Sequence, residues 1–300
     1  MGDALYPETL DATTIACRQF SIGGARIPAH KGNHFFVDYD LGNNGYSGKS
    51  WDKAWLSVAY ALTQVSDWDT VWVAGRGSEE TLVVPVGLDH LTLRGAHVSQ
   101  RAWHLENNAG SVTDPNIRCR ANFFTLMDVF IEPTTDAAAL VLIRDASEAV
   151  SKGNHATLVN VEVWTGRYGV DLQGAPHGFR AYGCKFRNLR SSGGTGIYVS
   201  DVAQTMAHRA HIKGCTFKGN INHLVGAFAD SLIEDNSFSA KANGDNDTTS
   251  MIDLRNGASN DVTRNHLAGT YAEPQYYASG SEDNWFGNYT SAGISTANPA

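Results

Sequence analysis

The stretch that decides the fold reads Ala181-Tyr-Gly-Cys-Lys-Phe186, and it returns as Ile212-Lys-Gly-Cys-Thr-Phe217. Its six positions are apolar, variable, Gly/Asp/Asn, small, variable and apolar. With small changes the pattern recurs at residues 93–98, 126–131, 158–163, 233–238 and 262–267. The fourth positions are therefore between 21 residues (215 to 236) and 33 residues (96 to 129) apart. A period of this size is typical of stacked repeats, each of which buries its apolar face only against its neighbours.

Each unit is predicted to be a strand, a turn with left-handed backbone at the Gly, Asp or Asn, and a second strand. No helical pattern lies between these strands, which excludes βαβ folds and leaves a chain that winds into a parallel β-helix. The fourth positions then form an inward column in which Cys184 and Cys215 are neighbours and Asn236 and Asn265 bond along the axis. The sixth positions form a second inward column, which contains Val98, Ile131, Val163, Phe186, Phe217, Phe238 and Leu267.

The N-terminal part has a different pattern. Residues 34–38 read as a strand, residues 39–48 as a loop rich in turn formers, and residues 69–75 as another strand. Between them, apolar residues at helical spacing predict a helix at about residues 51–66, with Ser50 as its cap.

These segments carry a resemblance. Phe36-Val-Asp38, the loop through Gly48, the helix and Asp69-Thr-Val-Trp-Val73 resemble the start of right-handed parallel β-helix proteins. That group is the pectate-lyase-like superfamily, which includes phage tailspikes and other virion spikes. The resemblance covers residues 34–267 and implies an all-β fold, a right-handed single-stranded parallel β-helix with one N-terminal capping helix. We expect residues 1–33 to form an N-terminal arm and residues 268–300 a C-terminal cap or extended arm.

Composition narrows the classes of partner. The formal net charge of −8 makes duplex nucleic acid an unsuitable partner, because phosphate binding needs a basic face. No apolar run approaches the roughly 20 residues of a membrane span. The first residues show neither the basic nor the apolar segment of a secretory signal, so we expect assembly in a host cytoplasm with reduced, buried thiols.

A search for catalytic carboxylates singles out residues 169–172, 196–199, 223–226 and 251–254, which read as one strand in four successive repeats. Their outward positions are Asp171, Tyr198, Val225 and Asp253. Strands are about 4.8 Å apart, so three steps put the two carboxylates roughly 14 Å apart, too far for the pair of a glycosidase. Asp171, Tyr198 and the nearby Asp201 are the catalytic candidates if the protein is an enzyme.

Other motifs give no cofactor or metal site. The segment 243–247 has oxygen ligands at alternate positions but lacks the Gly and Glu of a calcium loop. His208 and His211 are unsuited to a shared zinc ion on a strand. The outward fifth positions Lys185, Thr216 and Ser237 show no basic row, and no phosphate or dinucleotide loop is present. We therefore expect neither a cofactor nor a metal.

An apolar contact surface is expected instead. In the segment 223–229, Leu224 can point inward, and simple alternation then turns other apolar side chains outward. Aromatic residues gather near the C-terminal end and are typical of caps and subunit contacts. The predicted interface residues are Val225, Ala227, Phe228, Tyr276, Tyr277, Trp285 and Phe286.

The interpretation that these observations favour is a non-enzymatic structural protein of a virion. It would be a bacteriophage spike, fibre or capsid-decorating protein that forms a homotrimer and contacts other virion proteins. The alternative is a tailspike-type polysaccharide depolymerase, a lyase or glycoside hydrolase that acts on a host surface glycan. A third interpretation is a carbohydrate-binding module without catalysis. The resemblance alone does not choose among them, because one fold carries many functions.

Overall fold

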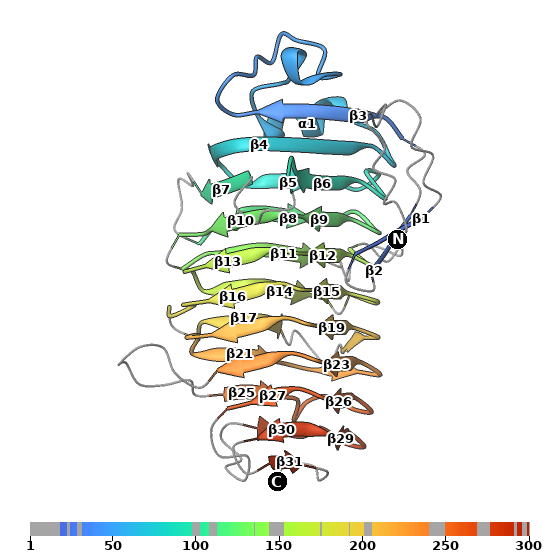
Figure 1. Ribbon diagram of the computed structural model, residues 1–300, viewed down its shortest axis with the longest axis vertical. Coiled ribbons are helices and arrows are strands. Elements are labelled where there is room, and N and C mark those ends of the chain that lie inside the picture. The colour runs from blue at the N-terminus through green and yellow to red at the C-terminus, as the bar shows by residue number, and fades with distance from the viewer. Residues whose placement is uncertain are drawn as a thin grey trace, which may run out of the picture.

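The protein is a parallel β-helix whose strands are stacked in rungs along one long axis (Figure 1). The computed structural model describes residues 19–22, 25–28, 32–97, 103–107, 113–134, 136–143, 153–174, 176–191, 193–200, 206–239, 250–268, 277–290, 293–295 and 299. Successive strands lie in three rows around a shared apolar core, and we call these rows faces 1, 2 and 3. Faces 1 and 2 are joined through β4 into a 19-stranded sheet, and face 3 is an 8-stranded sheet.

Face 1 consists of β3 (His34–Asp38), β4 (Thr70–Glu79), β6 (Thr92–Gly95), β9 (Thr125–Met127), β12 (Thr157–Val159), β15 (Arg180–Tyr182), β19 (His211–Lys213), β23 (Leu232–Glu234), β26 (Asp261–Thr263) and β29 (Asn284–Phe286). Face 2 consists of the second part of β4, β7 (Trp103–Asn107), β10 (Val129–Glu132), β13 (Glu162–Trp164), β16 (Lys185–Arg187), β20 (Thr216–Lys218), β24 (Ser237–Ser239), β27 (His266–Leu267) and β30 (Asn288–Thr290).

Face 3 consists of β5 (Leu82–Val84), β8 (Ile117–Cys119), β11 (Ala138–Ile143), β14 (Tyr168–Gln173), β17 (Thr195–Ser200), β21 (Asn222–Val225), β25 (Ser250–Asp253) and β28 (Tyr277–Ala278). Outside the faces, β1 (Gln19–Ile22) pairs with β2 (Ala25–Pro28), β18 (Ala207–His208) with β22 (Phe228–Ala229), and β31 (Gly293–Ser295) with β30.

The repeat aligns as predicted, because equivalent positions of successive units are partners across the parallel ladders. Phe186 pairs with Phe217, and Phe217 with Phe238. Their rings stack at centroid distances of 5.2 Å and 4.8 Å, and all three are buried. The sixth-position residues from Ile131 to Leu267 are buried, while Val98 lies outside the described residues. The predicted inward column is confirmed for this part of the chain.

The predicted turn between faces 1 and 2 also has the expected backbone. The third position has a positive φ in successive units, 55° at Asp128, 53° at Asn160, 61° at Gly183, 65° at Gly214 and 56° at Asp235. Only Gly adopts this conformation freely, and Asn and Asp tolerate it better than other residues. The turn therefore favours those three residue types in these five units, although Arg264 adopts the same conformation, with a φ of 55°, in the last unit.

The fourth-position column is buried from Val129 to Asn265, while Ala96 at its start is half-buried. At its lower end the column is a ladder of side-chain amides, in which Asn288 follows Asn236 and Asn265. The Asn236 side chain donates to Asn265 Oδ1 at 3.0 Å, and the Asn265 side chain donates to Asn288 Oδ1 at 3.1 Å. The expected bonding of stacked Asn side chains along the axis is confirmed.

The N-terminal helix is shorter than predicted. Residues 51–53 form a 3-10 turn, η1 (Trp51–Lys53), and the α-helix is α1 (Val58–Gln64), with its first turn capped by the Ser57 side chain. The chain between them is extended because Trp55 bridges to Val37 of β3 and exchanges backbone hydrogen bonds with Phe36 and Asp38. This tertiary pairing overrides the helical pattern, so Ser50 precedes only the 3-10 turn, without a side-chain cap hydrogen bond, and Trp51 is exposed.

Parallel pairing continues past Leu267, which was the expected end of the repeat. β29 pairs with β26, which places Trp285 beside Val262, and β30 pairs with β27. At the other end α1 lies at the level of the first rungs, where it contacts β3, β4 and β5 (Figure 1). Within the described part of the chain, no helix is long and apolar enough to cross a membrane.

Candidate functional site

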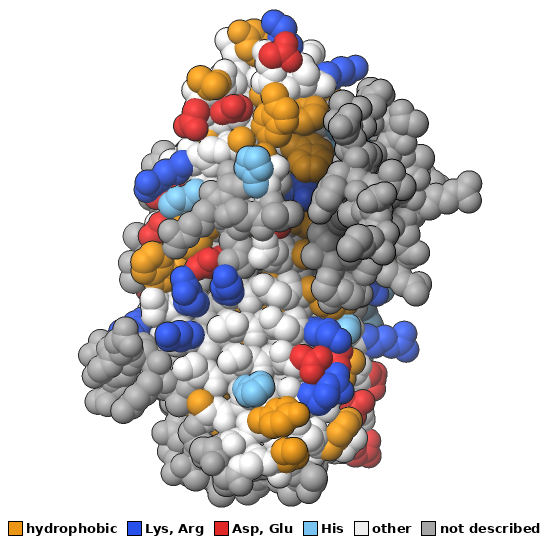
Figure 2. All heavy atoms as spheres, viewed as in Figure 1, with side chains coloured by type: hydrophobic (Ala, Val, Ile, Leu, Met, Phe, Trp, Pro, Cys, Tyr) orange, Lys and Arg blue, Asp and Glu red, His pale blue; other side chains and the backbone are white. Residues whose placement is uncertain are grey.

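Two outward columns on face 1 bring ionisable side chains together. The strand pairs β15–β19 and β19–β23 align Tyr182 with Lys213 and then with Glu234 in one column. In the neighbouring column Arg180 lies beside His211. Side chains two residues apart on a strand share a face, so all five residues point away from the core. Figure 2 shows basic and acidic side chains gathered over β19, β23 and β26, on the right of the view.

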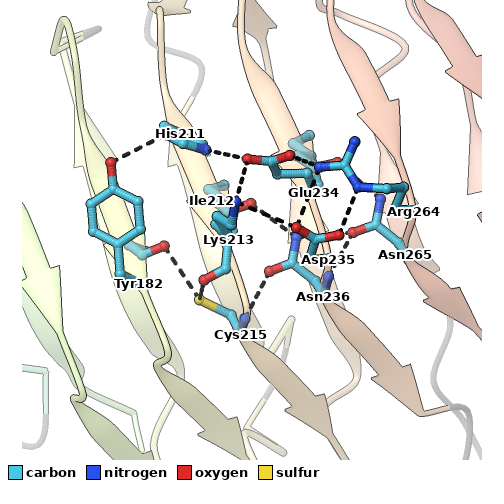
Figure 3. Close-up of polar contacts among 12 residues, drawn as sticks. Tyr182, His211, Ile212, Lys213, Cys215, Glu234, Asp235, Asn236, Arg264 and Asn265 are labelled. Atoms are coloured by element: carbon cyan, nitrogen blue, oxygen red, sulfur yellow. Dashed lines mark hydrogen bonds and ion pairs between the residues drawn. The ribbon is translucent and has the colours of Figure 1, made fainter. Parts of the chain in front are cut away.

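Tyr182, His211 and Glu234 form a hydrogen-bonded chain across three rungs (Figure 3). The Tyr182 hydroxyl lies 3.1 Å from His211 Nδ1, and His211 Nε2 lies 2.9 Å from Glu234 Oε1. An ionised carboxylate only accepts, so Nε2 carries the proton and Nδ1 of the neutral ring accepts the Tyr182 hydroxyl. Glu234 thereby fixes the tautomer and the orientation of the imidazole, and the ring's basic nitrogen faces the phenol.

Lys213, Asp235 and Arg264 surround the carboxylate end of this chain (Figure 3). Lys213 Nζ is 3.1 Å from Glu234 Oε1 and 3.5 Å from Asp235 Oδ2. Arg264 pairs with Glu234 and places its Nε 2.9 Å from Asp235 Oδ1. Two cations and two carboxylates are thus balanced, and the pairs bridge three consecutive rungs.

The surroundings shift the pKa values of the two end groups, Tyr182 and Glu234, in opposite directions. Burial raises the pKa of Tyr182 above its ordinary value, although the charges of Arg180 and Lys213 act to lower it. Burial also acts to raise the pKa of Glu234, but hydrogen bonds from His211 and Lys213 and the nearby cations outweigh it and hold that pKa below its ordinary value. At neutral pH the chain therefore runs from a protonated phenol through an imidazole to an ionised carboxylate.

Arg180 is the part of this site that is open to solvent. It is exposed, and it lies in the same strand as Tyr182 and directly beside His211 in the next. A guanidinium in that position can bind a carboxylate in bidentate fashion. The five residues Arg180, Tyr182, His211, Lys213 and Glu234 are called the face 1 cluster below.

The structure brings together two of the three catalytic candidates taken from the sequence. Asp171 pairs in register with Tyr198, Tyr198 with Val225, and Val225 with Asp253, so the expected outward column is present. Asp171 is only 6% exposed, however, and accepts a hydrogen bond of 2.7 Å from the Gln173 side chain. A polymeric substrate has little access to it. Asp201 lies outside the described residues.

The predicted interface residues are mostly internal. Phe228 and Tyr277 are 0% exposed, Trp285 1% and Ala227 4%, so their expected orientation toward a partner is wrong. The cause at Ala227 and Phe228 is Gly226, whose φ of 136° bends the chain and ends the alternation of β21 before β22 begins.

The remaining predicted interface residues are not buried in the same way. Phe286 is 42% exposed and Val225 is half-buried, whereas Tyr276 lies outside the described residues. His208 and His211 also have separate partners, because His208 stacks on His177 and His211 bonds to Glu234.

The face 1 cluster was missed, although its signal is in the repeat. The second position of the six-residue pattern is Tyr182, Lys213 and Glu234 in three successive units. Aligning the units vertically would have shown these residues as neighbours. On face 2, a hollow of about 320 Å³ is lined by Ser237, His266 and other residues, away from this cluster. Potential metal ligands in the described part of the chain converge on face 2 at His104, Glu106 and Glu132.

Comparison with known proteins places the fold. No family model matches the chain, and no curated protein matches it in sequence. Among solved structures, an alginate lyase from Paenibacillus sp. str. FPU-7 is 14% identical, with a TM-score of 0.55 over 80% of this chain and 96% of that one. A rhamnogalacturonan lyase is 11% identical, with a TM-score of 0.52 over 79% of this chain and 68% of that one.

A phage tailspike, the Dettilon tailspike protein, aligns at a lower TM-score of 0.48, with 12% identity over 77% of this chain and 49% of that one. The structural neighbours thus include polysaccharide lyases and a tailspike. At such identities a likeness to the two lyases concerns the fold alone. Together with the parallel register of the strands, it shows that this chain has a parallel β-helix fold.

Proposed function

We propose that the protein cleaves an acidic polysaccharide by β-elimination at the face 1 cluster. The observation that supports this function is the chain from Tyr182 through His211 to Glu234, with Arg180 exposed beside it. β-Elimination of a uronic acid needs a base for the proton next to the carboxylate, a proton for the leaving oxygen and a cation for the carboxylate. Each of these parts has a matching side chain here.

In this proposal Arg180 binds the sugar carboxylate and stabilises the charge that develops on it. His211 takes the phenolic proton of Tyr182, and the Tyr182 oxygen takes the proton at C5 of the sugar. The bond from C4 to the glycosidic oxygen breaks as the C4–C5 double bond forms, and the proton held by His211 goes to the leaving oxygen. Glu234 stabilises the imidazolium between these two transfers, as the carboxylate does in a catalytic triad.

The test is incubation of the full chain with a panel of polyuronates and acidic bacterial capsular polysaccharides, followed by the ultraviolet absorbance of the unsaturated ends. Tyr182→Phe and His211→Asn should each lower kcat at least about 100-fold, the usual size of an acid–base contribution. Arg180→Gln should mainly raise KM. The control Tyr289→Phe removes a hydroxyl on face 2 and should leave turnover unchanged.

The second candidate is the non-enzymatic virion protein. One observation favours it, since Lys213, Glu234, Asp235 and Arg264 already satisfy one another and tie three rungs together. In that case the face 1 cluster stabilises the β-helix and no polysaccharide is cleaved. Absence of turnover on the whole panel, or turnover that Tyr182→Phe leaves intact, would support this candidate.

For both candidates we propose a homotrimer on a bacteriophage particle, beside other virion proteins, and for the lyase we also propose contact with a host surface glycan. Exposed apolar side chains near the C-terminal end support a subunit contact there. Phe286 is 42%, Tyr289 46% and Ile294 65% exposed. Light scattering should give three times 32.4 kDa, and a monomer at micromolar concentration would count against this assembly.

A further inference from the structure

We propose that His104, Glu106 and Glu132 on face 2 form a binding site for a divalent transition-metal ion of the zinc class. The three side chains come from adjacent strands, because β7 and β10 pair in register and put Glu132 directly beside Glu106. His104 precedes Glu106 by two residues, so its ring points to the same outer face. Figure 2 shows acidic, basic and histidine side chains together over β7 and β10, at the upper left of the view.

The donor atoms have the spacing of a small coordination sphere. His104 Nε2 lies 3.1 Å from Glu132 Oε2 and 3.7 Å from Glu106 Oε1, and one ligand atom from each residue lies within 4.8 Å of the others. Tetrahedral zinc with ligands at about 2.0–2.1 Å has edges of about 3.3–3.4 Å between ligand atoms. The two distances bracket this value, and the oxygens of Glu106 and Glu132 lie within 4.8 Å of each other, so the three groups can reach one ion after their side chains adjust.

The charges of these side chains also favour a bound metal ion. The carboxylates of Glu106 and Glu132 lie directly opposite each other and repel, Arg76 offsets only one of the two charges, and a divalent cation between them would neutralise both. The donor set selects the ion, because imidazole suits zinc and other transition metals, whereas calcium takes oxygen ligands in larger number. The three side chains are 19%, 27% and 38% exposed, so an ion can enter and a water or substrate oxygen can take the fourth position.

The ring of His104 is positioned independently of any ion. It packs against Phe130 of the next strand, with ring centroids 4.6 Å apart at an interplanar angle of 60°. Phe130 itself is only 3% exposed, so its ring is fixed on the outer face. A ligand that is already oriented loses less freedom when it binds a metal.

Arg76 provides the sharpest test of this proposal. Its guanidinium pairs with the same Glu106 oxygen that faces His104, and its side chain is 64% exposed. Arg76 is therefore a competitor that a metal ion must displace or shift. If His104, Glu106 and Glu132 only form ion pairs and bind no metal ion, removing Arg76 does not increase the affinity of the protein for the metal.

The experiment is titration of the chelator-treated full chain with Zn²⁺ by calorimetry, with Co²⁺ absorbance as a second readout of four-coordinate geometry. We expect one equivalent at this site, and Glu132→Gln and His104→Gln should each weaken its binding at least about 10-fold. Arg76→Gln should tighten binding about two- to five-fold, the equilibrium equivalent of an exposed ion pair. His266→Gln, a histidine elsewhere on face 2, is the matched control and should change nothing.

Several results would overturn the site. These are no saturable Zn²⁺ binding in the micromolar range, Ca²⁺ binding in preference to Zn²⁺, or an affinity that neither Glu132→Gln nor His104→Gln alters. Unchanged affinity in Arg76→Gln would equally contradict the proposed competition. Binding is read without any substrate, so these results are independent of the glycan-cleaving activity proposed for face 1.

Discussion

The upper and lower parts of the fourth-position column share one backbone and differ in chemistry. In the upper rungs the position is held by Val129, Val161 and Cys184, and in the lower rungs by Asn236 and Asn265. Both parts are buried and both follow a turn with left-handed backbone. The position therefore requires a side chain that fits the turn, and an apolar character is only one way to meet that requirement.

The polar solution provides hydrogen bonds to the backbone that the apolar one cannot. Asn236, Asn265 and Asn288 donate at 2.9 Å to the carbonyl oxygens of Ile212, Ile233 and Val262, each in the preceding rung. At the junction, Cys215 does the same weakly, with its thiol 3.5 Å from the Ala181 oxygen. Beside their apolar core, the lower rungs are thus also linked by buried polar groups, each of which is costly to leave unpaired.

The largest effect is expected where the two parts share one apolar element, the sixth-position column. Phe217→Ala removes the middle ring of the stack between Phe186 and Phe238 and should lower the free energy of unfolding by about 3–5 kcal/mol. Chemical denaturation measures this, and Leu41→Ala at an exposed position is the control. An unfolding midpoint equal to that of the unchanged chain would refute the inward assignment.

The lower part should be the more sensitive to loss of its polar side chain. Asn265→Ala removes the side-chain hydrogen bonds that Asn265 makes with the backbone N–H of Asn236 and the carbonyl of Ile233. Burying unpaired groups of this kind should cost about 2–4 kcal/mol in unfolding free energy. Asn265→Asp is a second variant, which keeps the Oδ1 acceptor but replaces the donor by a carboxylate oxygen and adds a buried negative charge, so it should also be destabilising at neutral pH. Full stability of Asn265→Ala in urea would mean that water replaces the ladder.

Acid should also act on the lower part, through His223. This side chain is fully buried, and burial lowers its pKa to about 4, while an unfolded histidine titrates near 6.5. The unfolded chain then binds a proton that the folded chain refuses, so stability falls as pH decreases from about 6.5 toward 4. Between pH 7 and pH 5 the loss should be about 2 kcal/mol.

Urea titrations at both pH values measure this loss, and His223→Gln should remove it. The exposed His266 is the control, because His266→Gln should keep the full pH dependence. A pH slope that survives His223→Gln would assign the acid sensitivity to another group.

The smallest effect is expected at the junction between the two parts. Cys215→Ala removes a thiol that is a weak donor, and the loss should be about 1 kcal/mol. Its unfolding free energy, compared directly with that of Asn265→Ala, measures what an amide adds over a thiol at the same place in the turn. Equal losses of unfolding free energy in Cys215→Ala and Asn265→Ala would show that the amide adds nothing over the thiol.

The sequence predicts the inward side of this protein better than the outward side. Inward positions repeat, so the columns through Cys184 and Phe217 could be aligned by counting alone. The start of the helix could not, because Trp55 is drawn into an extended bridge with Val37 by a contact between separate segments. The bend at Gly226 is likewise invisible to a rule of strict alternation, which is why Phe228 was placed on the wrong side.

The two outward sites differ in how far they could have been found. Tyr182, Lys213 and Glu234 occupy one position of the repeat, and a vertical alignment of the units would have listed them together. Glu106 and Glu132 are brought side by side by pairing between β7 and β10, and no motif in the sequence contains both. The rungs differ in length, so the residues that pair between two strands cannot be counted from the sequence. The face 2 site is therefore found only from the structure.

The structure of the two ends of the stack affects whether one copy of the protein can pair with another. A column of parallel strands ends in an edge of unpaired backbone groups, and such an edge can template the next strand from another chain. At the first rung Trp55 pairs with β3, and α1 lies beside it. At the last rung β31 turns back antiparallel onto β30. These two departures from the repeat cover the edges of β3 and β30 and so hinder the addition of a strand from another chain at those places.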